Sequence, residues 1–564
     1  MARQGQVRFA PGVLDKHFRA EQLTPDQAVR RAIAITDRCE PLQRLLREAA
    51  PPRGRPRKIP LGVIARCVMV HSILVPNTQA MTRITDTLWA TLNPSQRFML
   101  GLNQVDPTYA RVRSSIRALI GLLEAPTHPA AHEDPEIDPR TGEVAEDISD
   151  GDPPLVSLDE LACALLNAAI PETVPTTGVM AIDGTDVETW ADSHGRSNAA
   201  IEAGDHGWDP DARFGHRTAT TDHPGDAYFG YAAHLATDVP TIGAPPVPHL
   251  ARGLVLRPAN SANAPAGIAL LTIMKRAHGL TTCLADRGYT IATADNFAEP
   301  AHQLGISIHM DLHTHQHVEH PGPEEGTVWV DGTLYSSALP QRLRKIAAPT
   351  LTQTAAEKAA QRDLFDKRCP YRMRATTRPD ANGARRFRGP AGDRSRRGTV
   401  RCRNVPESMD GPHHIPLTGC IKDEPCGCGI TVTVARHTYQ RDRQPLPWQS
   451  SRWFDSYGRR VGIESLNASI RRHHADINRG YIRVVGLAAV TTLLAFGLAG
   501  MNTRILNAWY TSRGVPEPWA TVLAEPPDER VPQRQHRRYR SKRGSPPTTP
   551  GGHTTKKRRT AHTT

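Results

Sequence analysis

At 564 residues and 61.8 kDa, the chain is long enough for two or three domains with sizeable cores. A hydrophobic content of 38% and a mean hydropathy of -0.46 indicate a soluble protein with disordered parts. The first residues, MARQGQVRFAPG, lack an apolar core, and the nine Cys are scattered. We therefore expect neither a secretory signal nor a disulfide scaffold. The expected compartment is the reducing cytosol.

The net charge of +13 is concentrated in two segments. Residues 341–404 carry 18 Lys/Arg against 5 Asp/Glu, and residues 526–564 carry 11 against 2. The rest of the chain is therefore net acidic. Such concentration is expected for phosphate contacts at defined places rather than for general coating of DNA, although a basic tail can also be only a solvated tail.

The first 59 residues are expected to form a helical arm and a basic linker. Residues 20–50 interleave apolar and basic side chains and predict helix. The following segment contains Arg53-Gly-Arg55-Pro, the core of a minor-groove hook whose Arg side chains would enter a narrow A·T groove. We favour the alternative, a cationic, Pro-rich linker between helical units.

Residues 60–130 are expected to form a compact helical unit that binds DNA. An apolar stripe at helical spacing predicts a packed helix after Pro107. The stripe comprises Val112, Ile116, Leu119 and Ile120, and the other faces carry Arg111, Arg113 and Arg117. Asp106-Pro107 fits an N-cap followed by Pro at the first helical position. The segment resembles the recognition helix of a helix-turn-helix, but a plain helix of a dimerising bundle fits equally well.

Residues 131–155 are expected to be a flexible linker. Between 133 and 152 the chain has 9 acids and one base with scattered Pro and Gly, which is too little apolar surface to order itself. A catalytic domain is expected at 156–515 and a disordered basic tail at 516–564.

Two short apolar runs end in aspartate. Val179-Met-Ala-Ile182 leads into Asp183-Gly-Thr, and Thr281-Thr-Cys-Leu-Ala285 leads into Asp286-Arg-Gly-Tyr289. Each pattern predicts a buried strand with a carboxylate at its end. Further strands are expected at 228–238, near 253–257 and at 305–310, with a helix at about 293–304.

A third carboxylate, Glu464, lies in the segment YGRRVGIESLNASIR, which begins at Tyr457. At roughly 100° per residue, four polar residues of this segment fall in one helical sector about 60° wide. They are Tyr457, Arg460, Glu464 and Arg471. A solvated helix face with an i,i+4 ion pair between Arg460 and Glu464 would explain the pattern equally well.

The spacing of these four residues resembles the Tyr-x2-Arg-x3-Glu-x6-Lys/Arg signature of a large group of bacterial insertion-sequence transposases, with Arg471 where Lys is commoner. The order of three antiparallel strands, helix, strand, helix and strand is similar to that of the ribonuclease H-like fold of the retroviral-integrase superfamily. The resemblance covers about residues 175–510. It implies an α/β catalytic core whose first and fourth strands lie side by side, preceded by an α-helical N-terminal domain and carrying a β-rich insertion at about 313–450.

The resemblance also implies an Asp-Asp-Glu site that holds two Mg²⁺ (or Mn²⁺) ions. Asp183 would bridge both ions, and Asp286 and Glu464 would hold one each, first for cleavage by water and then for attack of the freed 3′-OH on target DNA. The rival acids are Asp186, Asp238 and Asp311. A strand-end Asp usually caps a turn, and Asp186 would face the opposite side of its strand from Asp183.

Residues beside these acids are expected to contact the DNA. Tyr457, Arg460 and Arg471 suit contacts with end phosphates and a displaced nucleotide, and Arg287 is assigned the same partner. Structural pairing around Glu464 is the alternative.

The insertion contains the basic segment 341–404 and is expected to hold the DNA end. Its Trp329 and Trp448, and the later Trp453, could stack on an extruded base, although burial in a core is the favoured role of each. Four Cys could hold a structural zinc: Cys402, Cys420, Cys426 and Cys428. Because Cys-x-Cys is not the usual Cys-x2-Cys knuckle, we expect ordinary thiols.

Residues 484–501 form an apolar run long enough to raise a membrane span. A buried helix packed on the sheet explains the run better, because it contains Thr and Gly and directly follows the Glu464 helix. We expect no membrane partner.

The sequence thus predicts a metal-dependent cut-and-paste DNA transposase of the bacterial cytoplasm, associated with the nucleoid. Its partners would be double-stranded DNA, as terminal inverted repeats and as target, and a second copy of the chain, because two ends must be synapsed. A metal-dependent nuclease without strand transfer and a repurposed DNA-binding protein without catalysis are the alternatives.

Overall fold

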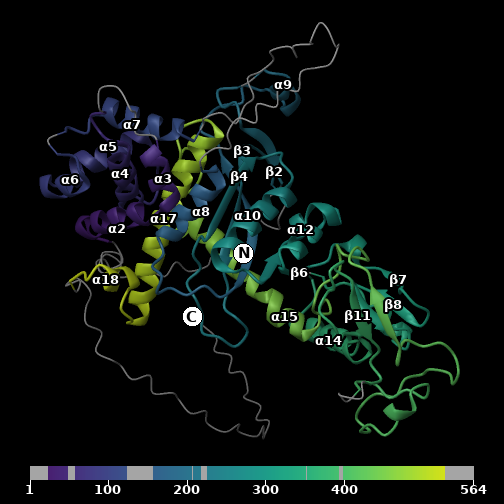
Figure 1. The fold of residues 1–564 in the computed structure, drawn as a ribbon. Coiled ribbons are helices and arrows are strands. Elements are labelled where there is room, and N and C mark those ends of the chain that lie inside the picture. Colours follow the sequence, from purple (N-terminus) through teal and green to yellow (C-terminus); the bar gives the residue numbers. More distant parts are fainter. Residues whose placement is uncertain are drawn as a thin grey trace, which may run out of the picture. The chain divides into compact units, whose positions relative to one another are not determined.

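The computed structural model describes residues 23–48, 57–103, 105–123, 156–205, 207–217, 225–350, 352–392 and 398–526 (Figure 1). Arg53 and Arg55 of the predicted hook, the acidic segment 133–152 and the basic residues beyond 526 lie outside these ranges. The described chain up to Pro526 forms one compact unit.

A six-stranded mixed sheet carries the two predicted strand-end aspartates. Its strands are β1 (Val179–Glu188), β2 (Arg213–His216), β3 (Ala227–Asp238), β4 (Gly253–Pro258), β5 (Thr282–Ala285) and β6 (Ser307–Met310). β3 is antiparallel to β1, and β2 and β4 pair with its other edge. β5 is parallel to β1, and β6 is parallel to β5. The order is therefore β4-β3-β1-β5-β6, and the short β2 pairs with the first four residues of β3 on the same edge as β4.

The first half of β1 is buried on both faces. Val179 and Ala181 belong to one hydrophobic core, and Met180 and Ile182 belong to another. Successive side chains of a strand point to opposite faces, so the continuous apolar run predicted from the sequence reflects helices on both sides of the sheet. These helices include α8 (Leu158–Ala168), α10 (Asn263–His278) and α17 (Leu487–Arg513), and shorter ones are α9 (Asn198–Glu202), α11 (Arg287–Thr290), η2 (Ala294–Asn296) and α12 (Ala298–Gln303).

The N-terminal helices share the first core with the sheet. They are α2 (Pro25–Arg38), α3 (Glu40–Glu48), α4 (Leu61–Leu74), α5 (Met81–Asp86), the π-helical turn η1 (Thr87–Thr91), α6 (Pro94–Leu100) and α7 (Tyr109–Gly121). Figure 1 shows them gathered beside α17, against which α4 packs. The helical part is therefore continuous with the packing of the sheet.

Helix α7 buries the predicted apolar stripe, since Val112 and Ile116 are in the core. Its start was predicted wrongly. Thr108, not Asp106, takes the N-cap position, and the helix begins at Tyr109. The backbone N–H of Thr108 donates to the Asp106 carbonyl, so a turn occupies the place of the predicted first helical residues.

The insertion contains two three-stranded antiparallel sheets. The first comprises β7 (Glu319–Pro321), β8 (Thr327–Val330) and β9 (Thr333–Ser336), and the second comprises β10 (Arg374–Ala375), β11 (Arg385–Arg388) and β12 (Thr431–Val434). Its helices and turns are η3 (Thr314–Gln316), α13 (Gln341–Arg344), α14 (Ala355–Asp366), η4 (Cys369–Tyr371) and η5 (Pro406–Ser408). Asp331 and Gly332 both have positive φ, 48° and 69°, as a two-residue hairpin between β8 and β9 requires.

Not all of the predicted basic segment is available to DNA. Arg368 is fully buried and donates to the Asp331 carboxylate. Trp329, Trp448 and Trp453 are also buried, so each has the favoured core role.

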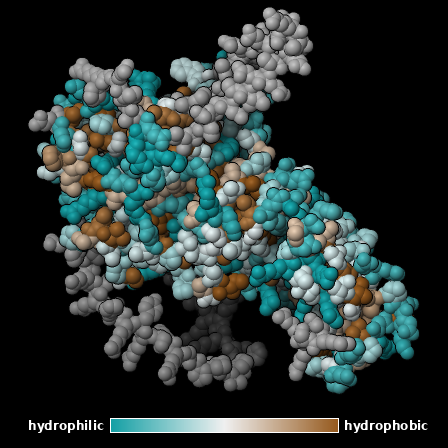
Figure 2. Space-filling view, viewed as in Figure 1, coloured by the Kyte–Doolittle hydropathy of each residue, from teal (hydrophilic) through white to brown (hydrophobic). Residues whose placement is uncertain are grey.

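The apolar run 484–501 lies almost entirely within α17. By length and composition α17 could cross a membrane, yet 94% of its apolar 18-residue stretch is buried inside the protein. It packs against α4, α8 and β4, so the sheet is only one of its partners. On the face shown in Figure 2, hydrophobic side chains form scattered patches rather than a continuous band.

The ordered chain extends past the predicted boundary at residue 515. The short helix α18 (Pro518–Val522) buries Trp519 completely, and the indole of Trp519 donates to the Ala169 carbonyl. Arg31 of α2 pairs with Glu517 and Glu525. A buried aromatic side chain and buried ion pairs therefore hold part of the segment that was expected to be disordered.

Candidate active site

The sheet brings Asp183 and Asp286 next to each other. β1 and β5 run parallel, with Ile182 opposite Ala285 in the register. The next residue of each strand is the aspartate. β5 stops there, and Asp286 takes the N-cap position of α11, while Asp183 remains within β1. The two carboxylates therefore leave neighbouring strands at the same level.

The third acid comes from a helical run after the insertion. The run comprises α15 (Ser451–Tyr457), the 3₁₀ turn η6 (Gly458–Arg460), α16 (Val461–Ala468) and the π-helical turn η7 (Ser469–His473). Helix α16 packs on β1 and β3 and buries Ile463 and Leu466. A Cβ at Gly462 would lie 2.9 Å from a methyl carbon of Val239, so the glycine lets the helix approach the sheet closely. Glu464 stays exposed at the rim.

Arg460 connects the three predicted acids. Its Nη2 lies 2.9 Å from Oε1 of Glu464 and 3.9 Å from Oδ1 of Asp286. Its Nη1 lies 3.7 Å from Oδ2 of Asp183. The carboxylates of a strand residue, a helix N-cap residue and a helix residue therefore converge on a single, mostly buried guanidinium.

Asp183 is the most buried of the three carboxylates, with 21% of its side chain exposed against 42% for Asp286 and 57% for Glu464. Burial raises the pKa of Asp183 to about 6. Arg460 opposes this rise in pKa, and the charges of Asp286 and Glu464 add to it. A cation beside Asp183 would remove this penalty, because it favours the charged form of the carboxyl group.

Asn467 is a site residue that the sequence analysis missed. Its Nδ2 donates to Oδ2 of Asp183 at 3.0 Å, while the backbone N–H of Gly184 donates to Oδ1 at 2.9 Å. Asn467 lies three residues after Glu464 on α16 and therefore on nearly the same face. That spacing was the available signal.

Tyr457 does not project freely from the helix. Its ring stacks on Trp453, with centroids 4.6 Å apart and planes inclined by 19°. Burial, together with the nearby Asp286 and Asp311 charges, raises the pKa of the Tyr457 hydroxyl against the opposing effect of Arg460. One face of the ring is thus engaged by Trp453 beside the site.

Arg471 faces β1 but does not join the three acids. Its Nη2 lies 2.8 Å from Oδ1 of Asp186, and it donates to Oγ1 of Thr185 and to the Asp186 carbonyl. Asp186 also pairs with Arg217. Burial opposes ionisation of Asp186, yet the two guanidiniums hold its pKa below the usual value. Arg471 therefore has other partners than Arg460 and Glu464, and the run that carries all three is not one uniform α-helix, because it includes a 3₁₀ turn and a π turn.

The remaining rival acids also have structural partners. Asp311 accepts hydrogen bonds from Arg287 and from the Trp448 indole. Asp238 is buried and pairs with Arg252. Arg287, predicted to bind DNA, is therefore engaged by Asp311, although about half of its side chain is exposed.

Tyr289 anchors the Asp286-Arg-Gly-Tyr segment from below. It is fully buried, and its hydroxyl group lies 2.8 Å from Nδ1 of His234 on β3. A Cβ at Gly267 of α10 would lie 2.6 Å from its ring. The tyrosine thus fixes α11, and with it the position of Asp286.

The arginines predicted on the N-terminal helix do not contribute to this site. Arg113 and Arg117 are exposed on α7, and Arg111 donates to the Asp106 carbonyl.

Comparison of the sequence with protein-family models and with curated proteins gave no match, and comparison of the structure with solved structures gave none either.

Proposed function

We propose that this protein is a DNA transposase with a ribonuclease H-like core, which cleaves strands at the ends of a mobile element and joins the freed 3′-OH to target DNA. The observation that carries the proposal is the convergence of Asp183, Asp286 and Glu464 on Arg460. The resemblance of the sequence to insertion-sequence transposases assigns the same three acids to catalysis.

The sheet supports this proposal. The order β4-β3-β1-β5-β6, with β1, β5 and β6 parallel and β3 antiparallel, is the one that the ribonuclease H-like fold requires. The insertion between β6 and the Glu464 helix also has the expected place and β content.

The donor set suits Mg²⁺ or Mn²⁺. Three carboxylates face one guanidinium, so the cluster keeps a net negative charge, and hard divalent ions take oxygen ligands. Asp183, Asp286 and Glu464 would hold the ions. When bound, such ions activate the attacking oxygen and stabilise the leaving oxygen of a phosphodiester.

The chain's own residues orient this donor set. Asn467 and the N–H of Gly184 fix the two oxygens of Asp183. Nη1 of Arg460 is buried beside Asp183 without a hydrogen-bond partner. The guanidinium would therefore act on a phosphate of a bound DNA end through its positive charge. Among the described residues of the predicted DNA-binding set, Arg460 contacts all three acids.

Binding of DNA would use exposed arginines outside the site. Arg374 of β10 and Arg385 and Arg386 of β11 are exposed in the basic segment of the insertion, and Arg113 and Arg117 are exposed on α7. Phosphate contacts of this kind give salt-dependent affinity. We further propose that the protein acts in the bacterial cytoplasm as a homodimer, because two transposon ends must be brought together.

A joining assay tests this function. The purified full-length protein would be incubated with Mg²⁺, a DNA fragment that ends in the inverted repeats flanking its gene, and a supercoiled target plasmid. We expect cleaved ends covalently joined to the plasmid through their 3′-OH groups. Cleavage without joining would instead support a nuclease, and binding without cleavage would support a DNA-binding protein.

A further inference from the structure

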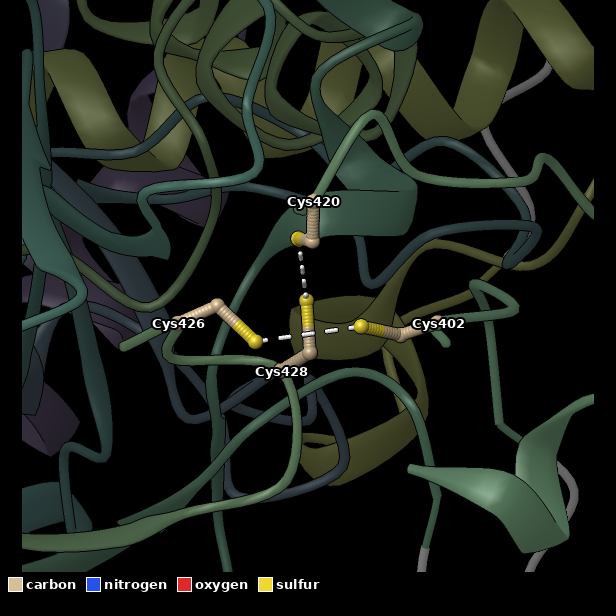
Figure 3. Close-up of side chains that lie close together, drawn as sticks. All are labelled: Cys402, Cys420, Cys426 and Cys428. Carbon is tan, nitrogen blue, oxygen red and sulfur yellow. Dashed lines mark hydrogen bonds between the residues drawn. The ribbon is translucent and has the colours of Figure 1, made fainter. Parts of the chain in front are cut away.

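Four cysteines of the insertion bring their sulfur atoms together although they come from two separate loops (Figure 3). Cys402 lies in the first loop, and Cys420, Cys426 and Cys428 lie in the second. The Sγ atoms of Cys402 and Cys426 are 3.7 Å apart, and those of Cys420 and Cys428 are 3.8 Å apart. All four sulfur atoms lie within 4.8 Å of one another.

These separations fit a tetrahedral metal site. A disulfide joins sulfur atoms only about 2.05 Å apart. Sulfur atoms about 2.3 Å from a central zinc ion form a tetrahedron whose edges are about 3.8 Å long. Both measured pairs match that edge, and the nine cysteines, all in the described part of the chain, are free thiols.

The neighbours of the sulfur atoms are hydrogen-bond donors suited to thiolates. Nδ2 of Asn404 lies 3.5 Å from Sγ of Cys426, and the Ser336 hydroxyl group lies 3.2 Å from Sγ of Cys428. Oδ1 of Asn404 also accepts a hydrogen bond from the backbone N–H of Asp423, and its Nδ2 donates one to the Glu424 carbonyl. Asn404 therefore connects the two loops. Donors beside metal-bound sulfur orient the ligands of such sites.

The segment that carries the cysteines has little other support. Between residues 398 and 430, all of which are described, there is no strand and no helix beyond the short 3₁₀ turn η5, and the backbone otherwise forms turns and isolated bridges. Such a segment lacks the hydrogen-bonded ladders that order a chain, yet Cys402 and Cys428 are completely buried. Small substructures of this kind are commonly held by a metal ion or disulfides.

Gly427 adds a geometric requirement. A Cβ at Gly427 would lie 2.3 Å from the Gly326 carbonyl oxygen, just before β8. The Cys426-Gly-Cys428 loop is therefore pressed against the β7–β9 sheet, and only glycine allows both cysteines to reach the cluster. Cys-x-Cys, which argued against zinc in the sequence, is accommodated by this contact.

We propose that Cys402, Cys420, Cys426 and Cys428 bind a structural zinc ion that staples the two loops of the insertion to the β7–β9 sheet. Four sulfur ligands leave no open position for a substrate, which distinguishes a structural zinc site from a catalytic one. Soft thiolates select zinc over the hard ions that suit the carboxylate site. The zinc site is independent of the proposed function.

The site also has a consequence for the basic sheet. β12 begins three residues after Cys428, and β11, which carries Arg385 and Arg386, pairs with β12. The backbone N–H of Ala391, just after β11, donates to the Cys428 carbonyl. Zinc would therefore hold the exposed arginines of β11 in place.

Elemental analysis of the full-length protein tests the proposal. After expression in zinc-supplemented medium, we expect zinc equimolar with the chain in the wild type. The double variant C402S/C426S should lose the metal. C369S should retain it, because Cys369 lies in the same insertion but outside the cluster. Iron in place of zinc, or wild-type protein without bound metal, would overturn the proposal.

A second measurement covers the case in which the double variant does not fold. Wild-type protein stripped with a chelator would be titrated with Co²⁺, whose tetrahedral thiolate complex absorbs visible light, and then with Zn²⁺ as competitor. We expect saturable binding that Zn²⁺ displaces and Mg²⁺ does not. Proteolysis within 398–430 should also accelerate at least about tenfold on stripping. Four fewer free thiols in protein denatured with a chelator but without reductant than in the same protein after reduction would show disulfides instead and contradict the proposal.

Discussion

The guanidinium of Arg460 and the carboxylate of Glu464 lie one helical turn apart and form an ion pair, with Nη2 2.9 Å from Oε1. The same guanidinium reaches Asp183 and Asp286 on the sheet. The two hypotheses for this helix, a surface ion pair and a catalytic face, are therefore compatible. The i,i+4 pair exists, and it lies beside Asp183 and Asp286.

Removing the charge of Arg460 should raise the pKa of Asp183 above about 6, because Arg460 is the main group that lowers it. A carboxyl pKa that is higher in the folded than in the unfolded protein gives stability at low pH that is lost as pH rises through the folded pKa. In metal-free R460M this loss should extend above pH 6 and amount to about 1 kcal/mol more than in the wild type.

Urea unfolding between pH 5 and pH 8 measures this difference. R472M is the matched control, since Arg472 is exposed in the same helical run. An R460M profile that parallels the wild type would contradict the electrostatic role of Arg460.

Replacing Arg31 by Met should lower the free energy of unfolding by about 3–5 kcal/mol, because it leaves the buried carboxylates of Glu517 and Glu525 without their partner. The neighbouring Arg30 is exposed on the same helix, so R30M should change stability by no more than about 0.5 kcal/mol. Chemical denaturation of the three proteins measures both effects. Equal stability of R31M and R30M would show that the C-terminal segment does not depend on α2.

His71 should make the protein less stable as pH falls below 6.5. Burial lowers its pKa to about 4, and its ring contacts the Thr87 hydroxyl and the Thr78 carbonyl. A lowered pKa gives stability that is complete above the unfolded value and is lost as pH falls toward the folded one, about 2 kcal/mol between pH 6.5 and pH 5. In H71Q this part of the pH dependence should disappear, whereas in H473Q, where the side chain is exposed, it should remain. Unfolding free energies at the two pH values decide the matter.

The strands and the three acids could be predicted because each depends on local pattern. An apolar run that ends in Asp is visible at Ile182-Asp183 and Ala285-Asp286, and helical spacing links Arg460 to Glu464. The four-residue β2 was missed, since Arg-Phe-Gly-His has neither alternation nor an apolar run. It forms because the N-terminal half of β3 offers it an edge.

Other features depend on contacts between distant segments. The ion pair between Arg471 and Asp186 joins residues far apart in the sequence, and the helical run of Arg471 contains 3₁₀ and π turns that the sequence pattern did not predict. The cysteine cluster depends on two loops that meet only in the folded insertion, so spacing alone argued against it. Trp519 is buried although it lies in the segment 516–564, which was expected to be a disordered tail.

The most direct test of the catalytic site is single-turnover cleavage and joining of terminal-repeat DNA by E464Q, compared with D455N. Asp455 is an exposed acid nine residues earlier in the same helical run, so D455N should keep wild-type rates. E464Q should be slower by at least about 10³-fold, which corresponds to about 4 kcal/mol of activation free energy. E464Q that cleaves and joins ends as fast as the wild type would contradict the assignment of Asp183, Asp286 and Glu464 as the catalytic acids.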